Sequence, residues 1–171
     1  SNNEKIPKWK VRNSNGYYIN SFLNSLPISF KQKKILRDHD SLKFKKEILS
    51  NLKSKNEIIL TSGAVSAGKY DFIPGIIKKF KLRYYFKGVS IRPGKPIMFA
   101  KFLKNKVFFG LPGNPISSAA CIRFFVLPFL YFSMGMKENK PINVRLKNSF
   151  SKKKNFTRFI KGKLTFSNKG I

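Results

Sequence analysis

Short apolar runs alternate along this chain with longer segments in which apolar residues recur at every third or fourth position. The short runs are rich in β-branched and aromatic residues, as strands are, and the longer segments have the spacing of one helical face. The predicted strands are residues 28–36, 57–61, 84–91, 97–102 and 107–111. The predicted helices are residues 14–25, 41–52, 72–80 and 116–134. This alternation predicts an α/β fold, a sheet with helices packed on its faces, in which residues 57–61 form a buried central strand.

Residues 116–134 form an apolar stretch that is nearly long enough to span a bilayer. Arg123 lies inside this stretch and Pro128 interrupts it, and a charged side chain inside a lipid bilayer is costly. Asn114 and Pro115, which precede it, suit the N-cap and the first position of a helix. We therefore expect a buried or interface helix of a soluble fold, and no membrane partner.

After residue 139 the pattern changes to alternation with period two, at residues 142–146 and 156–166. This predicts two domains, an α/β domain over residues 1–139 and the start of a small β-domain over residues 140–171. The second has too few strands to close a sheet, and the chain opens on a polar stretch without methionine. We expect a piece of a longer protein, truncated at both ends.

Basic residues outnumber acidic residues by 36 to 7, which gives a net charge of +29. Neutralisation of phosphates by basic side chains dominates nucleic-acid affinity, so nucleic-acid binding is one hypothesis. However, 29 of the 36 are lysines spread along the whole chain, in a composition typical of an AT-rich genome. We therefore favour a compositional origin, with no nucleic-acid partner, and expect the surface to attract small anions.

The chemistry open to this chain is limited by its reactive side chains. One cysteine, Cys121, and one histidine, His39, exclude a disulfide framework, a cysteine zinc cluster and a histidine metal cage. Without a secretion signal, the expected location is the cytoplasm. The three aspartates, Asp38, Asp40 and Asp71, all fall in predicted loops, which makes them candidate functional acids.

Three loops rich in glycine or proline follow apolar strands: TSGAVSAGKYDF at 61–72, RPGKP at 92–96 and LPGNP at 111–115. Backbone N–H groups in such turns, next to a helix N-terminus, bind phosphate or an oxyanion. Asp71 offers the hard oxygen that Mg²⁺ requires beside a phosphate, and it also suits the N-cap of the next helix. Arg92 and Lys95 suit an anion. Because strand ends of α/β sheets form ligand crevices, we predict a site for an anionic, phosphorylated ligand with Mg²⁺.

In this order and spacing, the three motifs resemble molybdopterin molybdenumtransferase, the MoeA and gephyrin E-domain family. The likeness covers residues 11–135, and residues 142–171 are similar to the start of the family's C-terminal β-subdomain. It implies a three-layer molybdopterin-binding sheet like that of MoaB and Mog. It also implies a cytoplasmic homodimer that inserts molybdenum from molybdate into adenylyl-molybdopterin, with Mg²⁺ and release of AMP.

The resemblance also implies roles for individual residues. Asp71 and Asp38 match the family's catalytic or metal-binding acids, with Asp40 as an alternative to Asp38. The implied substrate-binding residues are Ser62, Gly63, Ser66, Gly68, Arg92, Pro93, Gly94, Lys95, Pro112, Gly113, Asn114 and Pro115. Ala64 replaces a usual glycine, so we expect an undemanding φ there. Asn13 replaces a usual aspartate and receives no role, and Lys69 replaces a small or acidic residue.

Two other functions remain open. One is molybdopterin adenylyltransferase, which shares the fold but carries a Gly-Gly-Thr-Gly loop where this chain has Ser62-Gly63-Ala64-Val65. That enzyme is also a candidate partner. The other is a gephyrin-like scaffold without catalysis. Family members complete their site with preceding subdomains of the partner chain, so we expect residues 1–171 alone to be poorly active.

Overall fold

The computed structural model describes residues 13–36, 40–65, 73–80, 83–102, 105–137, 140–151 and 155–165. The helices are α1 (Ser14–Asn24), α2 (Ser41–Lys53), α3 (Ile73–Lys79), α4 (Pro115–Cys121) and α5 (Leu127–Ser133), with a π-helical turn at Ile122–Val126 between the last two. The strands are β1 (Ile58–Ser62), β2 (Arg83–Lys87), β3 (Ile91–Arg92), β4 (Met98–Lys101), β5 (Val107–Leu111) and β6 (Thr157–Arg158).

Strands β1, β5, β4 and β2 form a four-stranded sheet in that order. β1 runs parallel to β5, and β4 is antiparallel to both β5 and β2. β5 is buried at every position, whereas β1 is half-buried and ends exposed at Ser62. The prediction that residues 57–61 form the central strand is therefore wrong, because β1 lies at one end of the described sheet. The sequences of β1 and β5 are both apolar, so local pattern does not distinguish them. Their places in the sheet depend on which strands they pair with.

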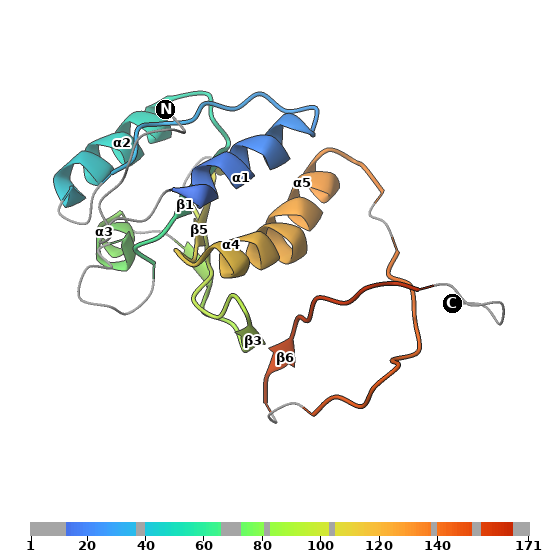
Figure 1. Cartoon of the computed structure of the whole chain (residues 1–171). Helices are drawn as coiled ribbons and strands as arrows, with labels where there is room; N and C mark the ends of the chain where they lie inside the picture. Colours follow the sequence, from blue (N-terminus) through green and yellow to red (C-terminus); the bar gives the residue numbers. More distant parts are fainter. Residues whose placement is uncertain are drawn as a thin grey trace, which may run out of the picture.

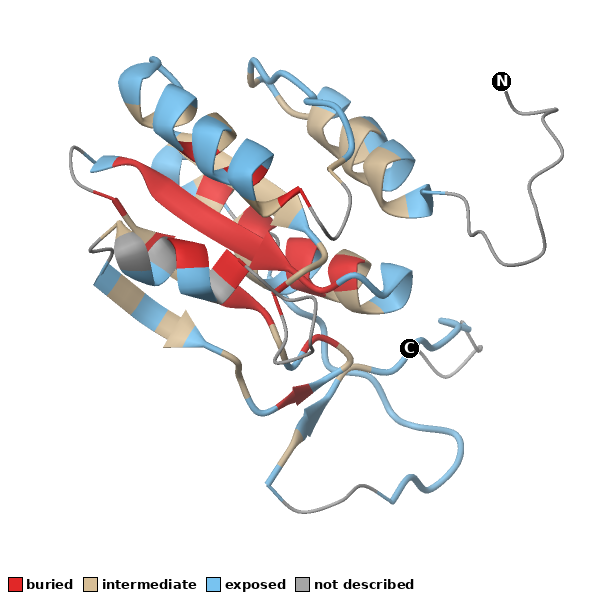
Figure 2. Ribbon diagram, turned by 90° about the vertical axis from the view of Figure 1, so that its left-hand side faces the viewer, coloured by how far each residue is buried: buried red, intermediate tan, exposed pale blue. Residues whose placement is uncertain are grey.

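Helices cover both faces of this sheet, so the molecule has three layers (Figures 1 and 2). On one face, α2 and α3 cover Met98 and Phe108. On the other face, α1, α4 and α5 cover Phe99, Phe109 and Leu111. Side chains of β4 and β5 alternate between the faces and so contribute to both cores. The predicted α/β fold with helices on both faces is confirmed.

Residues 115–133 form the predicted long helix, and the side chain of Asn114 caps it by accepting a hydrogen bond from the backbone N–H of Ser117 at 3.1 Å. Among the described residues, this helix is the one long and apolar enough to cross a membrane by length and composition. Ile122, Val126 and Leu130 are buried against the sheet. The buried share of this helix is 33%, so one side of it packs on the sheet. The absence of a membrane partner remains a prediction.

Four predicted strand segments are not formed as expected. Residues 28–36 are irregular, and residues 84–91 divide into β2 and the separate short β3. Residues 142–146 form no strand; their apolar side chains are exposed, and none of the described strands pairs with them. Of residues 156–165, only β6 is a strand, and it pairs in parallel with β3 of the preceding region. The boundary at residue 139 remains a prediction.

Candidate functional site

The ends of three strands bring the predicted loops to one edge of the sheet. Ser62, at the end of β1, pairs with Leu111 at the end of β5. β4 runs the other way, and its first residue, Met98, pairs with Gly110. The segment 92–96 therefore approaches the same edge before β4 begins. Of the first loop, residues 61–65 are described, whereas Ser66, Gly68, Lys69 and Asp71 lie outside the described residues, as does Asp38.

Asn15, near the start of α1, joins the first and third loops. Its side-chain nitrogen donates to the Ser62 hydroxyl at 2.7 Å and to the Gly113 carbonyl at 2.8 Å. The Ser62 hydroxyl in turn donates to the carbonyl of Pro112 at 3.4 Å. These bonds fix the two loops relative to each other at the edge where β1 and β5 end.

The backbones of these two loops lie close together through their glycines. The N–H of Gly63 donates to the carbonyl of Leu111 at 2.9 Å, and a Cβ at Gly113 would lie 3.6 Å from the Cα of Gly63. Gly63 has φ +92°, which glycine adopts without penalty. Ala64 has φ +54°, so the expectation of an undemanding φ at this position is wrong. An L-residue in this region is strained by about 1–2 kcal/mol.

The loop 92–96 is anchored against α4 at Gly94. Gly94 has φ +114°, and a Cβ there would lie 2.8 Å from the sulfur of Cys121. The thiol of Cys121 contacts the Gly94 carbonyl at 3.5 Å. Burial raises the pKa of Cys121 to about 12, so the thiol stays neutral and is unsuited to act as a nucleophile. The peptide bond between Arg92 and Pro93 is cis.

Arg92 and Lys95 are exposed and lie over the ring of Phe156, at 5.1 Å for the Arg92 guanidinium carbon and 5.8 Å for the Lys95 nitrogen. Among the described residues, the two cations contact this ring and not Asn15, Ser62 or Gly113. The structure thus brings Ser62, Gly63, Pro112, Gly113 and Asn114 together and places the two cations in a neighbouring cluster. Asn114 and Pro115 serve here as the start of α4.

Asp40, the alternative acid, occupies the N-cap position of α2. Its carboxylate forms an ion pair with Lys43 at 2.7 Å, and it is 9% exposed. The ion pair with Lys43 is local to the start of α2. Within the described residues, no group of three or more histidine, cysteine, aspartate or glutamate side chains is arranged to hold a metal ion. Asp38 and Asp71, which lie outside the described residues, and Asp40 as the alternative remain the predicted acids of the Mg²⁺ site.

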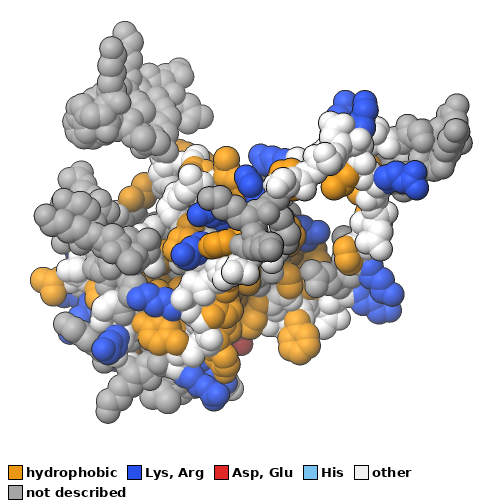
Figure 3. Space-filling view, turned by 90° about the horizontal axis from the view of Figure 1, so that it is seen from below, with side chains coloured by type: hydrophobic (Ala, Val, Ile, Leu, Met, Phe, Trp, Pro, Cys, Tyr) orange, Lys and Arg blue, Asp and Glu red, His pale blue; other side chains and the backbone are white. Residues whose placement is uncertain are grey.

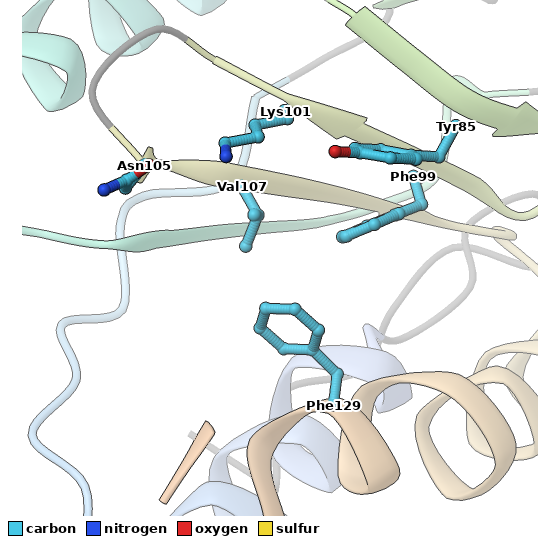
Figure 4. A pocket seen from close by; sticks show the side chains of 6 residues that line it. All are labelled: Tyr85, Phe99, Lys101, Asn105, Val107 and Phe129. Carbon is cyan, nitrogen blue, oxygen red and sulfur yellow. The ribbon is translucent and has the colours of Figure 1, made fainter. Parts of the chain in front are cut away.

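A hollow of about 360 Å³ lies at the opposite end of β5, beside the hairpin formed by β4 and β5. It is lined by Tyr85, Phe99, Lys101, Asn105, Val107 and Phe129 (Figure 4). Val107 pairs with Ile58, at the start of β1, whereas the loops follow the end of β1. The hollow is therefore separate from the candidate site.

Basic side chains are scattered over the surface seen in Figure 3, among apolar side chains, and do not gather into one stripe. The compositional origin of the positive charge remains a prediction.

Residues 2–131 match the family described as "Probable molybdopterin binding domain". The chain belongs to this family. This molybdopterin-binding domain is 32% identical over 170 residues to the molybdopterin molybdenumtransferase of Staphylococcus epidermidis, covering 98% of this chain and 40% of that protein. It is 33% identical to the enzyme of the same name from Staphylococcus aureus, with the same coverage. The chain thus spans about two fifths of the length of these relatives.

Solved structures show that the molybdopterin-binding domain has the expected three-layer fold. The molybdopterin biosynthesis MoeA protein from Pyrococcus horikoshii matches with a TM-score of 0.63 at 24% identity, over 78% of this chain and 32% of that one. The tungsten cofactor synthesizing protein MoaB from Pyrococcus furiosus matches with a TM-score of 0.56 at 15% identity, over 77% of this chain and 89% of that one.

Two residues of the domain were missed by sequence reasoning. Asn15 lies at the start of α1, two residues after Asn13, the position that departs from the family. In the structure Asn13 is the N-cap, accepting from the N–H of Gly16 at 3.1 Å, and Asn15 makes the long-range bonds. The second is Phe156, which no motif marks, because an aromatic residue in an alternating segment is typical of packing.

Proposed function

We propose that the protein to which this domain belongs inserts molybdenum from molybdate into adenylyl-molybdopterin, with Mg²⁺ and release of AMP. The observation that carries this proposal is the bridge from Asn15 to Ser62 and Gly113, which holds two glycine-containing loops together at one sheet edge. Support comes from the relatives named molybdopterin molybdenumtransferase. Because the chain spans about 40% of their length, the activity is proposed for the whole protein.

In this proposal the glycine loops bind the pterin phosphate. Gly63 and Gly113 carry no side chains, so a ligand can approach the backbone closely, and Ser62 would orient it together with Ser66 and Gly68. Arg92 and Lys95 attract molybdate or phosphate. Pro93, Gly94 and Pro112 shape the loops that present these groups.

Asp71 and Asp38 are the proposed acids of the site. Carboxylate oxygens are the ligands that Mg²⁺ prefers, and the ion, when bound, would neutralise phosphate charge as AMP leaves. The family resemblance assigns these two residues. Asp40 is a weaker candidate, because its carboxylate is already paired with Lys43.

We further propose that the whole protein is a cytoplasmic homodimer whose partners are small anionic substrates. Molybdopterin adenylyltransferase, which would supply the adenylylated substrate, is a candidate partner. We expect neither nucleic-acid nor membrane binding. The packing of residues 115–133 on the sheet supports the second expectation.

The test is an assay of AMP release from adenylyl-molybdopterin by the full-length protein with Mg²⁺, with and without molybdate. Molybdate-dependent release should fall at least about 100-fold in Asp71→Asn, since removing a catalytic carboxylate typically costs this much or more. Glu57→Gln is the matched control, because Glu57 precedes β1 at the end away from the loops. Equal rates in both variants would refute the role of Asp71.

Two outcomes would replace the proposal. If the protein makes adenylyl-molybdopterin from ATP and releases no AMP with molybdate, it is an adenylyltransferase. If it does neither but still forms a dimer, the scaffold function is the better conclusion.

A further inference from the structure

The segment 156–159 lies beside the start of the loop 92–96 and is hydrogen-bonded to the residues there. The N–H of Thr157 donates to the carbonyl of Ser90, and the N–H of Phe159 donates to the carbonyl of Arg92, both at 2.8 Å. These bonds belong to the pairing of β6 with β3. In Figure 1 the chain leaves the α/β layers after α5 and returns to them at this point.

A second contact ties the same segment to the long helix. The rings of Phe159 and Phe124 are stacked, with centroids 3.8 Å apart and planes 11° from parallel. The segment is therefore anchored both to the base of the loop and to the helix behind it. Phe156, one residue before β6, is placed by these anchors.

Phe156 holds two cations at once, because the Arg92 guanidinium carbon and the Lys95 nitrogen lie 5.1 and 5.8 Å from its ring centroid. Both distances are within the range of a cation–π contact. Of the acids in the described residues, Asp40 is paired with Lys43 and Glu47 with Lys33. Glu57 precedes the opposite end of β1.

An aromatic ring orders a cation in a different way from a carboxylate. A carboxylate partner neutralises the charge, whereas the ring attracts it through its quadrupole and leaves the net charge intact. Long basic side chains lose considerable rotamer freedom when they bind a ligand, and holding them in advance lowers that cost. Because Arg92 and Lys95 are exposed, their donors remain open to solvent while the ring supports them.

We propose that Phe156 is a positioning residue that holds Arg92 and Lys95 as a preorganised clamp for a tetrahedral oxyanion. The oxyanion is either molybdate or the phosphate of the pterin substrate, which share charge and geometry. This inference rests on the proposed function, because that function supplies the anion. It extends the site to a segment far along the chain from the three motif loops.

The test measures binding of molybdate and, separately, of inorganic phosphate to the full-length protein by calorimetry at fixed low ionic strength. Phe156→Leu should weaken binding about three- to tenfold, in line with the loss of two exposed cation–π contacts. Phe156→Tyr keeps the ring and should bind within about twofold of the wild type. The arm with the larger loss identifies which oxyanion the clamp holds.

Phe150→Leu is the matched control. Phe150 precedes β6, and its ring carries the guanidinium of Arg158 at 5.4 Å, whereas Arg92 and Lys95 lie over Phe156. This variant loses a contact of the same kind and should bind both anions as the wild type does. Thermal unfolding of each variant checks that the fold is retained.

Unchanged or tighter binding in Phe156→Leu would overturn the inference. Equal losses in Phe156→Leu and Phe150→Leu, or a loss in Phe156→Tyr as large as that in Phe156→Leu, would also overturn it.

Arg92→Gln separates this inference from the proposed function. If it binds both anions like the wild type, the loop is no clamp and the inference fails. If Arg92→Gln and Phe156→Leu both weaken binding but the wild type releases no AMP, the clamp stands and the proposed reaction fails. In an active enzyme, Phe156→Leu should raise KM for molybdate and leave kcat unchanged.

Discussion

Asn15 and Ser62, 47 residues apart in the sequence, are joined by a hydrogen bond of 2.7 Å from the side-chain amide to the hydroxyl. The same amide nitrogen reaches the carbonyl of Gly113, 98 residues from Asn15. One side chain thus connects the start of α1 with the ends of β1 and β5.

Asn15→Ala should lower the free energy of unfolding by about 1–2 kcal/mol, because two hydrogen bonds are lost. Asn15→Asp should be at least as destabilising, since a carboxylate cannot donate to the Gly113 carbonyl. Urea unfolding followed by circular dichroism measures both. Asn24→Ala, at the exposed end of the same helix, is the control, and equal effects at the two positions would contradict the bridging role.

Gly94→Ala should lower the free energy of unfolding by about 3 kcal/mol, through overpacking and a positive φ. The overpacking arises because the new Cβ would lie 2.8 Å from the sulfur of Cys121. Adding Cys121→Ala should restore part of the loss caused by Gly94→Ala, which a double-mutant cycle measures. Gly162→Ala, where a Cβ meets nothing within 4 Å, is the control. Strict additivity in the cycle would refute the steric cause.

Lys106→Met should lower the free energy of unfolding by about 3 kcal/mol, because the substitution removes a cationic donor and two backbone carbonyls then have no partner. Lys106 is 8% exposed, and its side-chain nitrogen donates to the carbonyls of Ser54 and Asn56 in the turn before β1. Lys55→Met, an exposed position between these two residues, should change the stability little. Chemical denaturation of both variants is the measurement. A comparable loss in Lys55→Met would point to net charge instead.

Stability should fall in alkali because of Cys121. Burial raises the pKa of its thiol to about 12 in the folded chain, from 9.0 when exposed. The unfolded chain therefore loses this proton first, and the contribution present below pH 9 is lost as the pH rises toward 12. Between pH 8 and 10.5 the stability of the wild type relative to Cys121→Ala should fall by about 2 kcal/mol. A difference independent of pH would refute the shift.

Local pattern was sufficient for the elements whose signal lies within a few residues. Helical spacing located α1 and α2, and Asn114 followed by Pro115 marked the start of the long helix, where the cap is observed. The apolar run 107–111 predicts a strand, and β5 is buried at every position in the structure. The three motif loops were found by their glycines and prolines and by their places after strands.

The same kind of pattern failed where the outcome depends on distant neighbours. Residues 142–146 alternate like a strand but pair with none of the strands that the structure describes, whereas β6 pairs with β3. β1 has the composition of a central strand but lies at one end of the described sheet. A strand is stable only with a partner, and the partner is not encoded in the strand's own residues.

The sequence by itself determined the α/β class, the family and the residues of the three loops, because periodicity, capping and turn chemistry are local properties. Only the tertiary structure decided that Asn15 holds Ser62 and Gly113, and that Phe156 supports Arg92 and Lys95. The two hydrogen bonds of Asn15, for example, join residues that are 47 and 98 positions apart in the sequence. They arise from strand order and helix packing, which are settled by the energy of the whole fold and not by any one stretch of chain.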